Sequence, residues 1–264
     1  MAVKKIVAIG GGEFGRIAGS GERLPYETAE IDEEIIRISG KEKPRCLLLA
    51  HAQFVNGAAS EEKYYDAMRR IYGEKFGCEV RRLKSSDLTE GLEKASEYVE
   101  WADIVYEGGG DTAAMLGLWR RTGFDVLLKE AWEAGKVMCG LSAGAICWFA
   151  LGNTDSPGYR EKEVNKIPAL GFVDAYFSPH CQAEHKRESE IRSLKHINKA
   201  GLSVSNCAAL EIVGDGYRVL TSSPADSAFR PYVLRTFWRG GVLHEEEIKP
   251  SETFAPLAEL TALQ

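Results

Sequence analysis

The chain has 264 residues, of which 44% are hydrophobic and 27% are charged, a composition typical of folded globular proteins. It excludes a disordered or fibrous chain. The net charge of −6 and the lack of a long cationic run argue against nucleic acid as a partner. No run of about eighteen apolar residues occurs, so we expect no membrane partner.

The sequence also shows neither a signal peptide nor a disulfide pattern. The first apolar run, residues 6–9, is too short for a signal peptide and leads directly into glycines. The six cysteines show neither C-x-x-C pairs nor the density of a disulfide framework. We therefore expect reduced thiols in a cytoplasmic protein. No linker or repeat divides the chain, so we predict one α/β domain over residues 1–264.

Short apolar runs alternate with amphipathic stretches in the first half of the chain. Strands are predicted at residues 3–9, 46–50, 78–83, 104–106 and 137–139. Helices are predicted between them at residues 61–76, 88–99, 112–119 and 124–134. This alternation is typical of βαβ units and predicts a mostly parallel sheet flanked by helices.

The second half of the chain has a different pattern. Strands are predicted at residues 175–178, 208–213 and 217–222, with a further hairpin over residues 229–238 and 241–248 and a terminal helix or tail at residues 256–263. The close spacing of these strands predicts an antiparallel C-terminal portion.

The most informative motif is Gly-x-Ser-x-Gly at residues 140–144, which follows a short apolar strand and precedes an apolar, helix-like run. A serine on such a sharp turn is exposed because its small neighbours relieve crowding, so Ser142 is a candidate nucleophile. The Ala143 amide would then face the developing oxyanion. A plain glycine turn with Ser142 as a helix cap is the alternative.

A second oxyanion donor is expected in the glycine run at residues 108–110, at Gly109 or Gly110, because glycine lets backbone approach a substrate closely. A phosphate cradle is the alternative for this run and for Gly10–Gly12. Neither run is G-x-G-x-x-G with a suitably spaced acid, so no nucleotide cofactor is expected. No His-Glu-x-x-His cluster occurs, so no metal is expected.

A nucleophilic serine needs a base, and His180 is the best placed because it directly follows a predicted strand. His51 and His244 are alternatives, whereas His185 and His196 fall on a charged helix and are expected to be solvated.

The base in turn needs an orienting acid. Asp155, in the turn-rich segment 152–158, gives the chain order Ser, Asp, His. Asp174 and Glu184 are rivals because they lie near His180 in sequence, and a turn aspartate without catalytic function is the alternative for Asp155.

Together these segments resemble the peptidase E family, serine dipeptidases related to cyanophycinase, over roughly residues 3–225. The segments that carry the resemblance are residues 108–112, 140–145, 153–155 and 178–180. The resemblance implies a fold similar to class I glutamine amidotransferases, which is flavodoxin-like. It also implies Ser142 as nucleophile, His180 as base, Asp155 as orienting acid, and an acyl-enzyme.

Known members of the family cleave dipeptides with an N-terminal aspartate, and cyanophycinases cleave β-aspartyl-arginine units. The resemblance therefore implies a small peptide substrate with an acidic P1 residue and a cationic pocket. We expect the protein to be a monomer or a homodimer. The candidates for the pocket are His185, Lys186, Arg187 and Arg192. Cys181 stands where the family has an aromatic residue, which is a departure that concerns substrate preference.

Two other functions remain open. His244 and Glu246 have the spacing that amidotransferase-like glutaminases use late in the chain. The sharp turn at residues 140–144, here called the elbow, carries serine and not cysteine, however. A non-catalytic protein of the same fold could use the elbow cleft to hold an acidic peptide.

Overall fold

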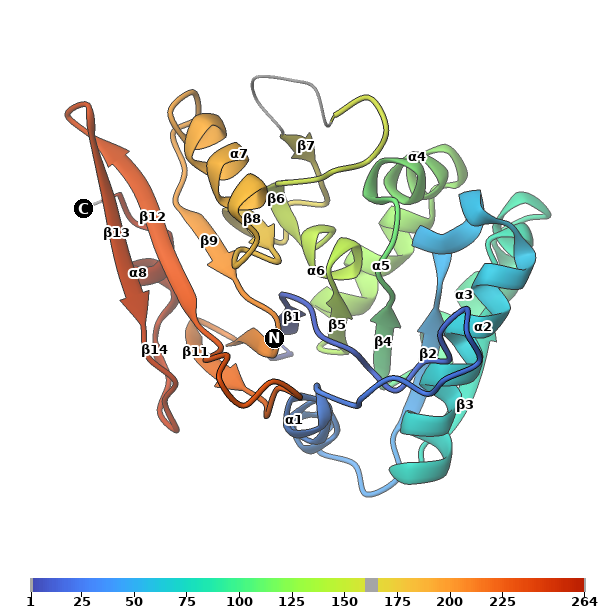
Figure 1. Cartoon of the computed structure of the whole chain (residues 1–264). Helices are drawn as coiled ribbons and strands as arrows, with labels where there is room; N and C mark the ends of the chain where they lie inside the picture. Colours follow the sequence, from blue (N-terminus) through green and yellow to red (C-terminus); the bar gives the residue numbers. More distant parts are fainter. Residues whose placement is uncertain (1, 160–165, 264) are drawn as a thin grey trace.

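The computed structural model of the protein describes residues 2–159 and 166–263, which form two β-sheets with helices around them (Figure 1). The strand order of the first sheet is β14-β11-β10-β1-β5-β4-β2-β3, and that of the second is β13-β12-β9-β8-β6-β7. The mixed α/β class predicted from the sequence is confirmed.

Five neighbouring strands of the first sheet are parallel. They are β1 (Lys5–Ile9), β5 (Val137–Leu141), β4 (Ile104–Glu107), β2 (Arg45–Leu49) and β3 (Glu79–Leu83). All five were predicted at these positions. Strands β1, β5, β4 and β2 are buried over almost their whole length, as a parallel sheet covered on both faces requires.

Helices cover both faces of these parallel strands. One face packs against α1 (Ala29–Ser39), α2 (Ala58–Met68) and the π-helical turn η2 (Arg69–Lys75). The other face packs against α3 (Glu93–Trp101), α4 (Thr112–Thr122) and α5 (Phe124–Glu133). Two short 3₁₀ turns, η1 (His51–Asn56) and η3 (Ser86–Thr89), follow β2 and β3. Helix α1 was missing from the sequence prediction.

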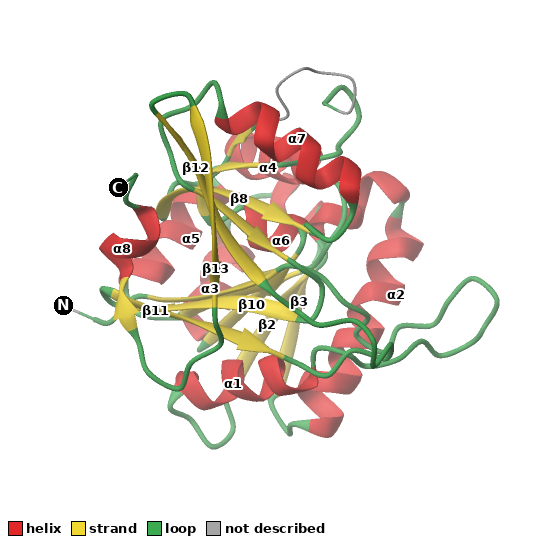
Figure 2. Cartoon of the chain, turned by 60° about the vertical axis from the view of Figure 1, so that its left-hand side comes forward, coloured by secondary structure: helices red, strands yellow, loops and turns green. Residues whose placement is uncertain are grey.

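The predicted antiparallel C-terminal strands are confirmed. Strands β10 (Ala208–Val213), β11 (Gly216–Thr221) and β14 (Ala255–Pro256) extend the first sheet beyond β1, each antiparallel to its neighbour. The short strand β14 was not predicted. Helix α8 (Leu257–Thr261) follows, close to the C-terminal end of the described residues (Figure 2).

The second sheet was not predicted as a separate layer. It contains β6 (Phe149–Gly152), β7 (Ile167–Pro168), β8 (Val173–Pro179), β9 (Gly201–Val204), β12 (Val233–Arg239) and β13 (Val242–Ile248). Strands β6, β8 and β9 are parallel, and the others are antiparallel. Strands β6, β7 and β9 were missed; all three are short, with four, two and four residues.

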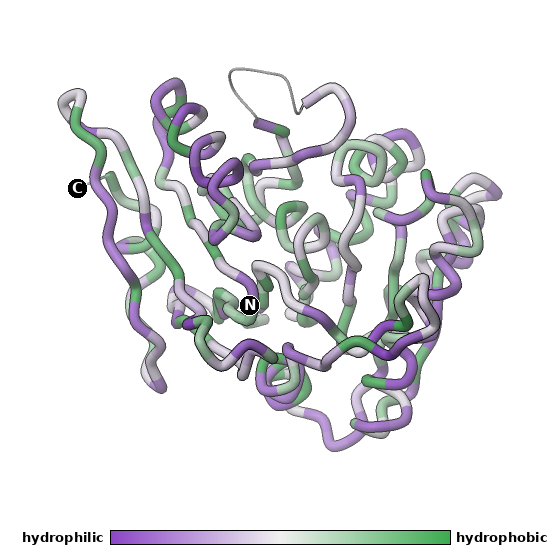
Figure 3. The backbone as a smooth tube through the Cα atoms, in the orientation of Figure 1, coloured by the Kyte–Doolittle hydropathy of each residue, from purple (hydrophilic) through white to green (hydrophobic). Residues whose placement is uncertain are grey.

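The two sheets share a hydrophobic core. One cluster of buried side chains joins Ile6 and Met138 of the first sheet to Phe177 and Leu202 of the second. Helix α7 (Glu184–Leu194) lies on the second sheet, and the outer strand β13 is mainly hydrophilic (Figure 3). All six cysteines are buried and unpaired. In the part of the chain that the structure describes, no helix is long and apolar enough to cross a membrane.

Candidate active site

Ser142 lies in a sharp turn between β5 and the short helix α6 (Ala143–Ile146), with φ 57° and ψ −110°. The two glycines of the motif allow β4 to pass close to this turn. A Cβ on Gly140 would lie 2.5 Å from the Glu107 carbonyl oxygen, and a Cβ on Gly144 would lie 2.1 Å from it. The residue types of the motif are therefore required by packing, and they leave Ser142 in a strained backbone conformation at the end of the strand.

The carboxyl end of β1 holds three other segments through consecutive carbonyl groups. The carbonyls of Ile9, Gly10 and Gly11 accept hydrogen bonds from the amides of Ser142, His180 and Cys207, at 3.0, 3.1 and 2.9 Å. Within the described residues, these three donors are also the non-glycine residues with positive φ. One strand end thus fixes three strained turns from distant parts of the chain.

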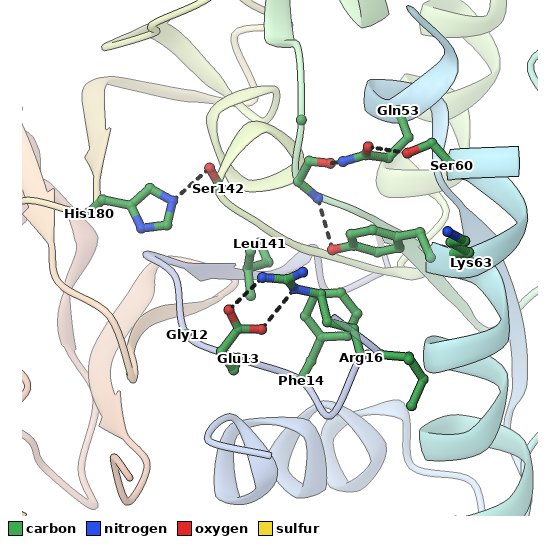
Figure 4. A pocket seen from close by; sticks show the side chains of 14 residues that line it. Gly12, Glu13, Phe14, Arg16, Gln53, Ser60, Lys63, Leu141, Ser142 and His180 are labelled. Carbon is green, nitrogen blue, oxygen red and sulfur yellow. Dashed lines mark hydrogen bonds and ion pairs between the residues drawn. The ribbon is translucent and has the colours of Figure 1, made fainter. Parts of the chain in front are cut away.

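These turns place the side chains of Ser142, His180 and Asn206 within hydrogen-bond distance of one another in that order. His180 Nε2 lies 3.0 Å from Ser142 Oγ, and His180 Nδ1 lies 2.7 Å from Asn206 Oδ1 (Figure 4 shows the first contact). Because an amide oxygen only accepts, Nδ1 carries the proton and Nε2 is left to accept from the serine hydroxyl. This is the tautomer that a general base toward Ser142 needs.

Gly11 explains why β1 is followed by a glycine run. A Cβ on Gly11 would lie 2.2 Å from Asn206 Oδ1 and 2.4 Å from the His180 ring. Gly11 therefore makes room for the histidine and its partner.

Burial lowers the pKa of His180, and the hydrogen bond to Asn206 raises it in part. The Lys186 ammonium also lowers this pKa, while the Asp155 carboxylate raises it. Since the net shift is downward, His180 is neutral at pH 7 and able to accept a proton.

The expected hydrogen bond between Asp155 and His180 is absent, because Asn206 and Ser142 occupy the two ring nitrogens. The Asp155 side chain is 53% exposed and forms an ion pair with Lys186 at 3.2 Å. The other two acids considered from the sequence are no better placed to orient His180. Asp174 is exposed and pairs with Lys199, and Glu184 is exposed at the start of α7.

The amides of residues 108–111 can be counted one by one. Gly108 donates to the Leu49 carbonyl, Gly109 to the Tyr64 hydroxyl, and Asp111 to the Ala52 carbonyl. The Gly110 amide has no acceptor among the described residues, and neither has the Ala143 amide. Of the two glycines considered from the sequence, Gly110 therefore has the available donor, whereas the Gly109 N–H is already used.

A cavity of about 380 Å³ opens beside Ser142 and His180. Its charged lining residues are Glu13, Arg16 and Lys63 (Figure 4). Glu13 and Arg16 pair with each other, whereas Lys63 pairs with no described residue. The cavity therefore presents a carboxylate and a cation to a ligand.

The cations expected from the sequence do not line this cavity. Lys186 pairs with Asp155, Arg187 pairs with Glu190 and Glu245, and Arg192 pairs with Glu188. His185 is exposed on α7. The α7 cations were placed wrongly with respect to the cavity: Lys186 and Arg187 pair with acids of neighbouring segments, and Arg192 is exposed.

The alternative bases do not reach Ser142. His51 is fully buried. Its Nε2 is hydrogen-bonded to the Leu83 carbonyl, and its Nδ1 accepts a hydrogen bond from Trp119 Nε1. His244 stacks on Phe237, with 5.0 Å between the ring centroids. Glu246, its partner in the glutaminase hypothesis, pairs with Arg235 instead. Among the described residues, no group of three or more His, Cys, Asp or Glu side chains could hold a metal ion.

Sequence reasoning missed Asn206, Glu13 and Lys63. Asn206 closely follows a strand end, as His180 does, but that strand is β9, which the sequence pattern did not reveal. Glu13 lies in a loop and Lys63 lies on α2, and only the fold brings both to the cavity beside Ser142.

Comparison with known proteins identifies the family of this chain. The model of peptidase family S51 matches residues 16–220. The uncharacterised peptidase YgaJ of Bacillus subtilis (strain 168) is 31% identical over 234 residues, which are 86% of this chain and 92% of that protein. The chain belongs to peptidase family S51. This membership confirms the resemblance to the peptidase E family and makes the protein a peptidase.

Solved structures show the same fold. A peptidase from an acI-B1 Actinobacterium superposes with a TM-score of 0.73 at 19% identity, covering 96% of this chain and 97% of the other. A candidate peptidase E protein of Listeria monocytogenes EGD-e gives a TM-score of 0.60 at 22% identity, covering 84% and 100%.

Proposed function

We propose that the protein is a serine peptidase that hydrolyses small peptides with an N-terminal aspartate, through an acyl-enzyme on Ser142. The observation that carries this proposal is the 3.0 Å contact between His180 Nε2 and Ser142 Oγ at the edge of the charged cavity. A serine within hydrogen-bond reach of an oriented, neutral histidine is the arrangement that nucleophilic catalysis needs.

The reaction uses each group in turn. His180 accepts the Ser142 proton as Oγ attacks the peptide carbonyl, and Asn206 holds the ring in place. The Gly110 and Ala143 amides stabilise the oxyanion. His180 then protonates the leaving amine, and water repeats the cycle to release the acyl group. A donor of this kind typically contributes about 10²–10³ in rate.

The charges of the cavity support an N-terminal acidic residue. Such a residue carries one ammonium and one side-chain carboxylate within a few bonds of the scissile carbonyl. Glu13 can accept from the ammonium, and Lys63 can neutralise the carboxylate. The family resemblance gives the same class of substrate, so we place its cationic contact at Lys63 and no longer on α7.

A dipeptide panel tests the proposal. Release of free amino acid from Asp-X, β-Asp-X, Glu-X and Ala-X dipeptides is measured for the wild type, Ser142→Ala and Lys63→Met. We expect Asp-X turnover in the wild type, none in Ser142→Ala, and a rise of roughly 10- to 100-fold in KM for Asp-X in Lys63→Met, since an ion-paired hydrogen bond contributes about 1.5–3 kcal/mol.

Arg192→Ala is the matched control, because it removes an exposed cation of α7 that does not line the cavity. Equal loss of Asp-X turnover in Arg192→Ala and Lys63→Met would contradict the assignment of Lys63. Equal turnover of Ala-X and Asp-X would contradict the acidic preference.

A further inference from the structure

The peptide group between Gly109 and Gly110 lies between the turn η1 and the nucleophile. On one side, Gln53 Nε2 donates to the Gly109 carbonyl at 2.5 Å. On the other side, a Cβ built on Gly109 would lie 3.5 Å from Ser142 Cβ. Figure 4 shows Gln53 and Ser142 on opposite sides of the backbone that Gln53 contacts.

The direction of the Gly110 amide follows from this contact. In a trans peptide the carbonyl and the next N–H point in opposite directions, and no cis peptide occurs in the described chain. Because the Gly109 carbonyl faces Gln53, the Gly110 N–H faces away from η1, on the side where Ser142 lies.

Glycine alone does not fix this orientation. Gly110 has φ 146°, and a Cβ there would lie 2.3 Å from the Ala52 carbonyl oxygen, so glycine is required. Glycine has weak backbone preferences, and the peptide before it is free to rotate unless another group holds it.

The Gln53 side chain is itself held in one orientation. Its Oε1 accepts from Ser60 Oγ at 2.8 Å and from Asn56 Nδ2 at 3.1 Å. Since two donors occupy Oε1, the Nε2 end is the one that faces Gly109. This arrangement links η1 and α2 to the candidate oxyanion site.

We propose that Gln53, held by Ser60, is a positioning residue that keeps the Gly109–Gly110 peptide turned so that the Gly110 amide faces the oxyanion. The inference rests on the proposed function, since it assigns a task within the Ser142 reaction. Gln53 acts through the backbone of Gly110 and has no direct role in bond breaking.

The kinetic test uses p-nitrophenyl acetate, whose acyl group makes no use of Lys63. Gln53→Met removes the hydrogen bond with little change of volume. We expect kcat to fall about 10–100-fold with KM within about threefold, because misaiming a donor acts on the transition state. Ser60→Ala is expected to give a smaller fall, and Ser60→Thr, which keeps the hydroxyl, is expected to restore kcat. A direct contact of Gln53 with the substrate would raise KM instead and overturn the proposal.

Val55→Ala is the matched control, because Val55 is on the same turn and 50% exposed. It is expected to leave kcat unchanged. A loss in Val55→Ala equal to that in Gln53→Met would show a general disturbance of η1 and contradict the positioning role.

A crystal structure of Gln53→Met separates this inference from the proposed function. We expect the Gly109–Gly110 peptide to be turned over or present in two orientations. If the wild type hydrolyses neither the ester nor any dipeptide, the proposed function fails, and the peptide orientation in the variant still decides the positioning claim. An unchanged peptide in Gln53→Met overturns that claim, whatever the activity.

Discussion

Asn206 occupies the position in which the sequence led us to expect a carboxylate. Its Oδ1 accepts from His180 Nδ1 as an aspartate oxygen would, so it selects the same tautomer. It carries no charge, however, and adds only a hydrogen bond to oppose the lowering of the His180 pKa by burial. At the residue scale, Asn206 therefore orients the His180 ring without adding a negative charge that would stabilise the protonated ring.

The third residue of the site can be identified by comparing two substitutions. Asn206→Ala frees His180 Nδ1 and is expected to lower kcat/KM for an Asp-X dipeptide by 10-fold or more, as loss of an oriented tautomer does (about 10⁴ in the best-known triad). Asp155→Ala is expected to change kcat/KM by less than about threefold, since its carboxylate does not contact the ring. The opposite order of effects would restore Asp155 to the role predicted from the sequence.

Asn206→Asp is expected to move the pH profile. A carboxylate beside the imidazole favours its charged form, so the pKa of His180 rises. Because catalysis needs the neutral ring, the acidic limb of kcat/KM against pH then shifts to higher pH than in the wild type. The measurement is kcat/KM between about pH 5 and pH 9. A shift to lower pH, or none, would mean that this ring does not limit the acidic branch.

At the scale of elements, the elbow depends on close contact between α6 and β4. A Cβ on Gly144 would lie 2.1 Å from the Glu107 carbonyl oxygen, and backbone cannot move aside as a side chain can. We expect Gly144→Ala to lower the free energy of unfolding by about 3 kcal/mol, the upper part of the usual range for overpacking.

Gly117→Ala is its control within a helix. Gly117 is inside α4, and a Cβ there would meet only the end of the Arg121 side chain, at 3.1 Å. This change is expected to stabilise the protein by about 0.5–1 kcal/mol. Urea unfolding of both variants checks the pair, and equal effects would show that the β4 contact does not limit the elbow.

Strand β4 also ends in a buried acid. Burial raises the pKa of Glu107 to about 8, although the hydrogen bond from the Ala52 amide lowers it in part. The folded protein therefore binds a proton that the unfolded chain releases near pH 4.5. The resulting stabilisation, on the order of a few kcal/mol, is complete below that pH and is lost as the pH rises toward 8.

Glu107→Gln removes this titration. Between pH 5.5 and 8.5 we expect the free energy of unfolding to fall more steeply in the wild type than in the variant. Guanidinium unfolding at these pH values, about one to four units above the ordinary pKa, measures the difference. Equal slopes would mean that Glu107 is not protonated in the native state at pH 5.5.

Elements with strong local patterns were predictable, and those that depend on distant partners were not. The strands of the first sheet carry apolar runs that end in glycine, and Ser142 is marked by its own neighbours. Asn206, in contrast, has no local signature, because its role comes from the approach of β9 to β1 in space. Charge on α7 suggested a pocket, yet Lys186 and Arg187 are used in ion pairs that only the packed structure reveals.

At the scale of the whole molecule, the two sheets share one buried cluster, so we expect them to unfold together. Phe177 of β8 is fully buried and stacks on Phe149 with 4.5 Å between ring centroids. Phe177→Ala is expected to cost about 3–5 kcal/mol and to lower the melting temperature by roughly 10 °C. Calorimetry should show one peak before and after the change. Two peaks would mean that the sheets are separate folding units, against the single domain predicted from the sequence.

The three carbonyls at the end of β1 find their hydrogen-bond partners at different times during translation. Their partners are the amides of Ser142, His180 and Cys207, and the last of these leaves the ribosome long after β1. A nascent chain that stops before Asn206 carries the serine without the group that aligns its base. The peptidase is thus expected to stay inactive during its own translation, and it becomes able to cut peptides only when the C-terminal strands have joined the sheets.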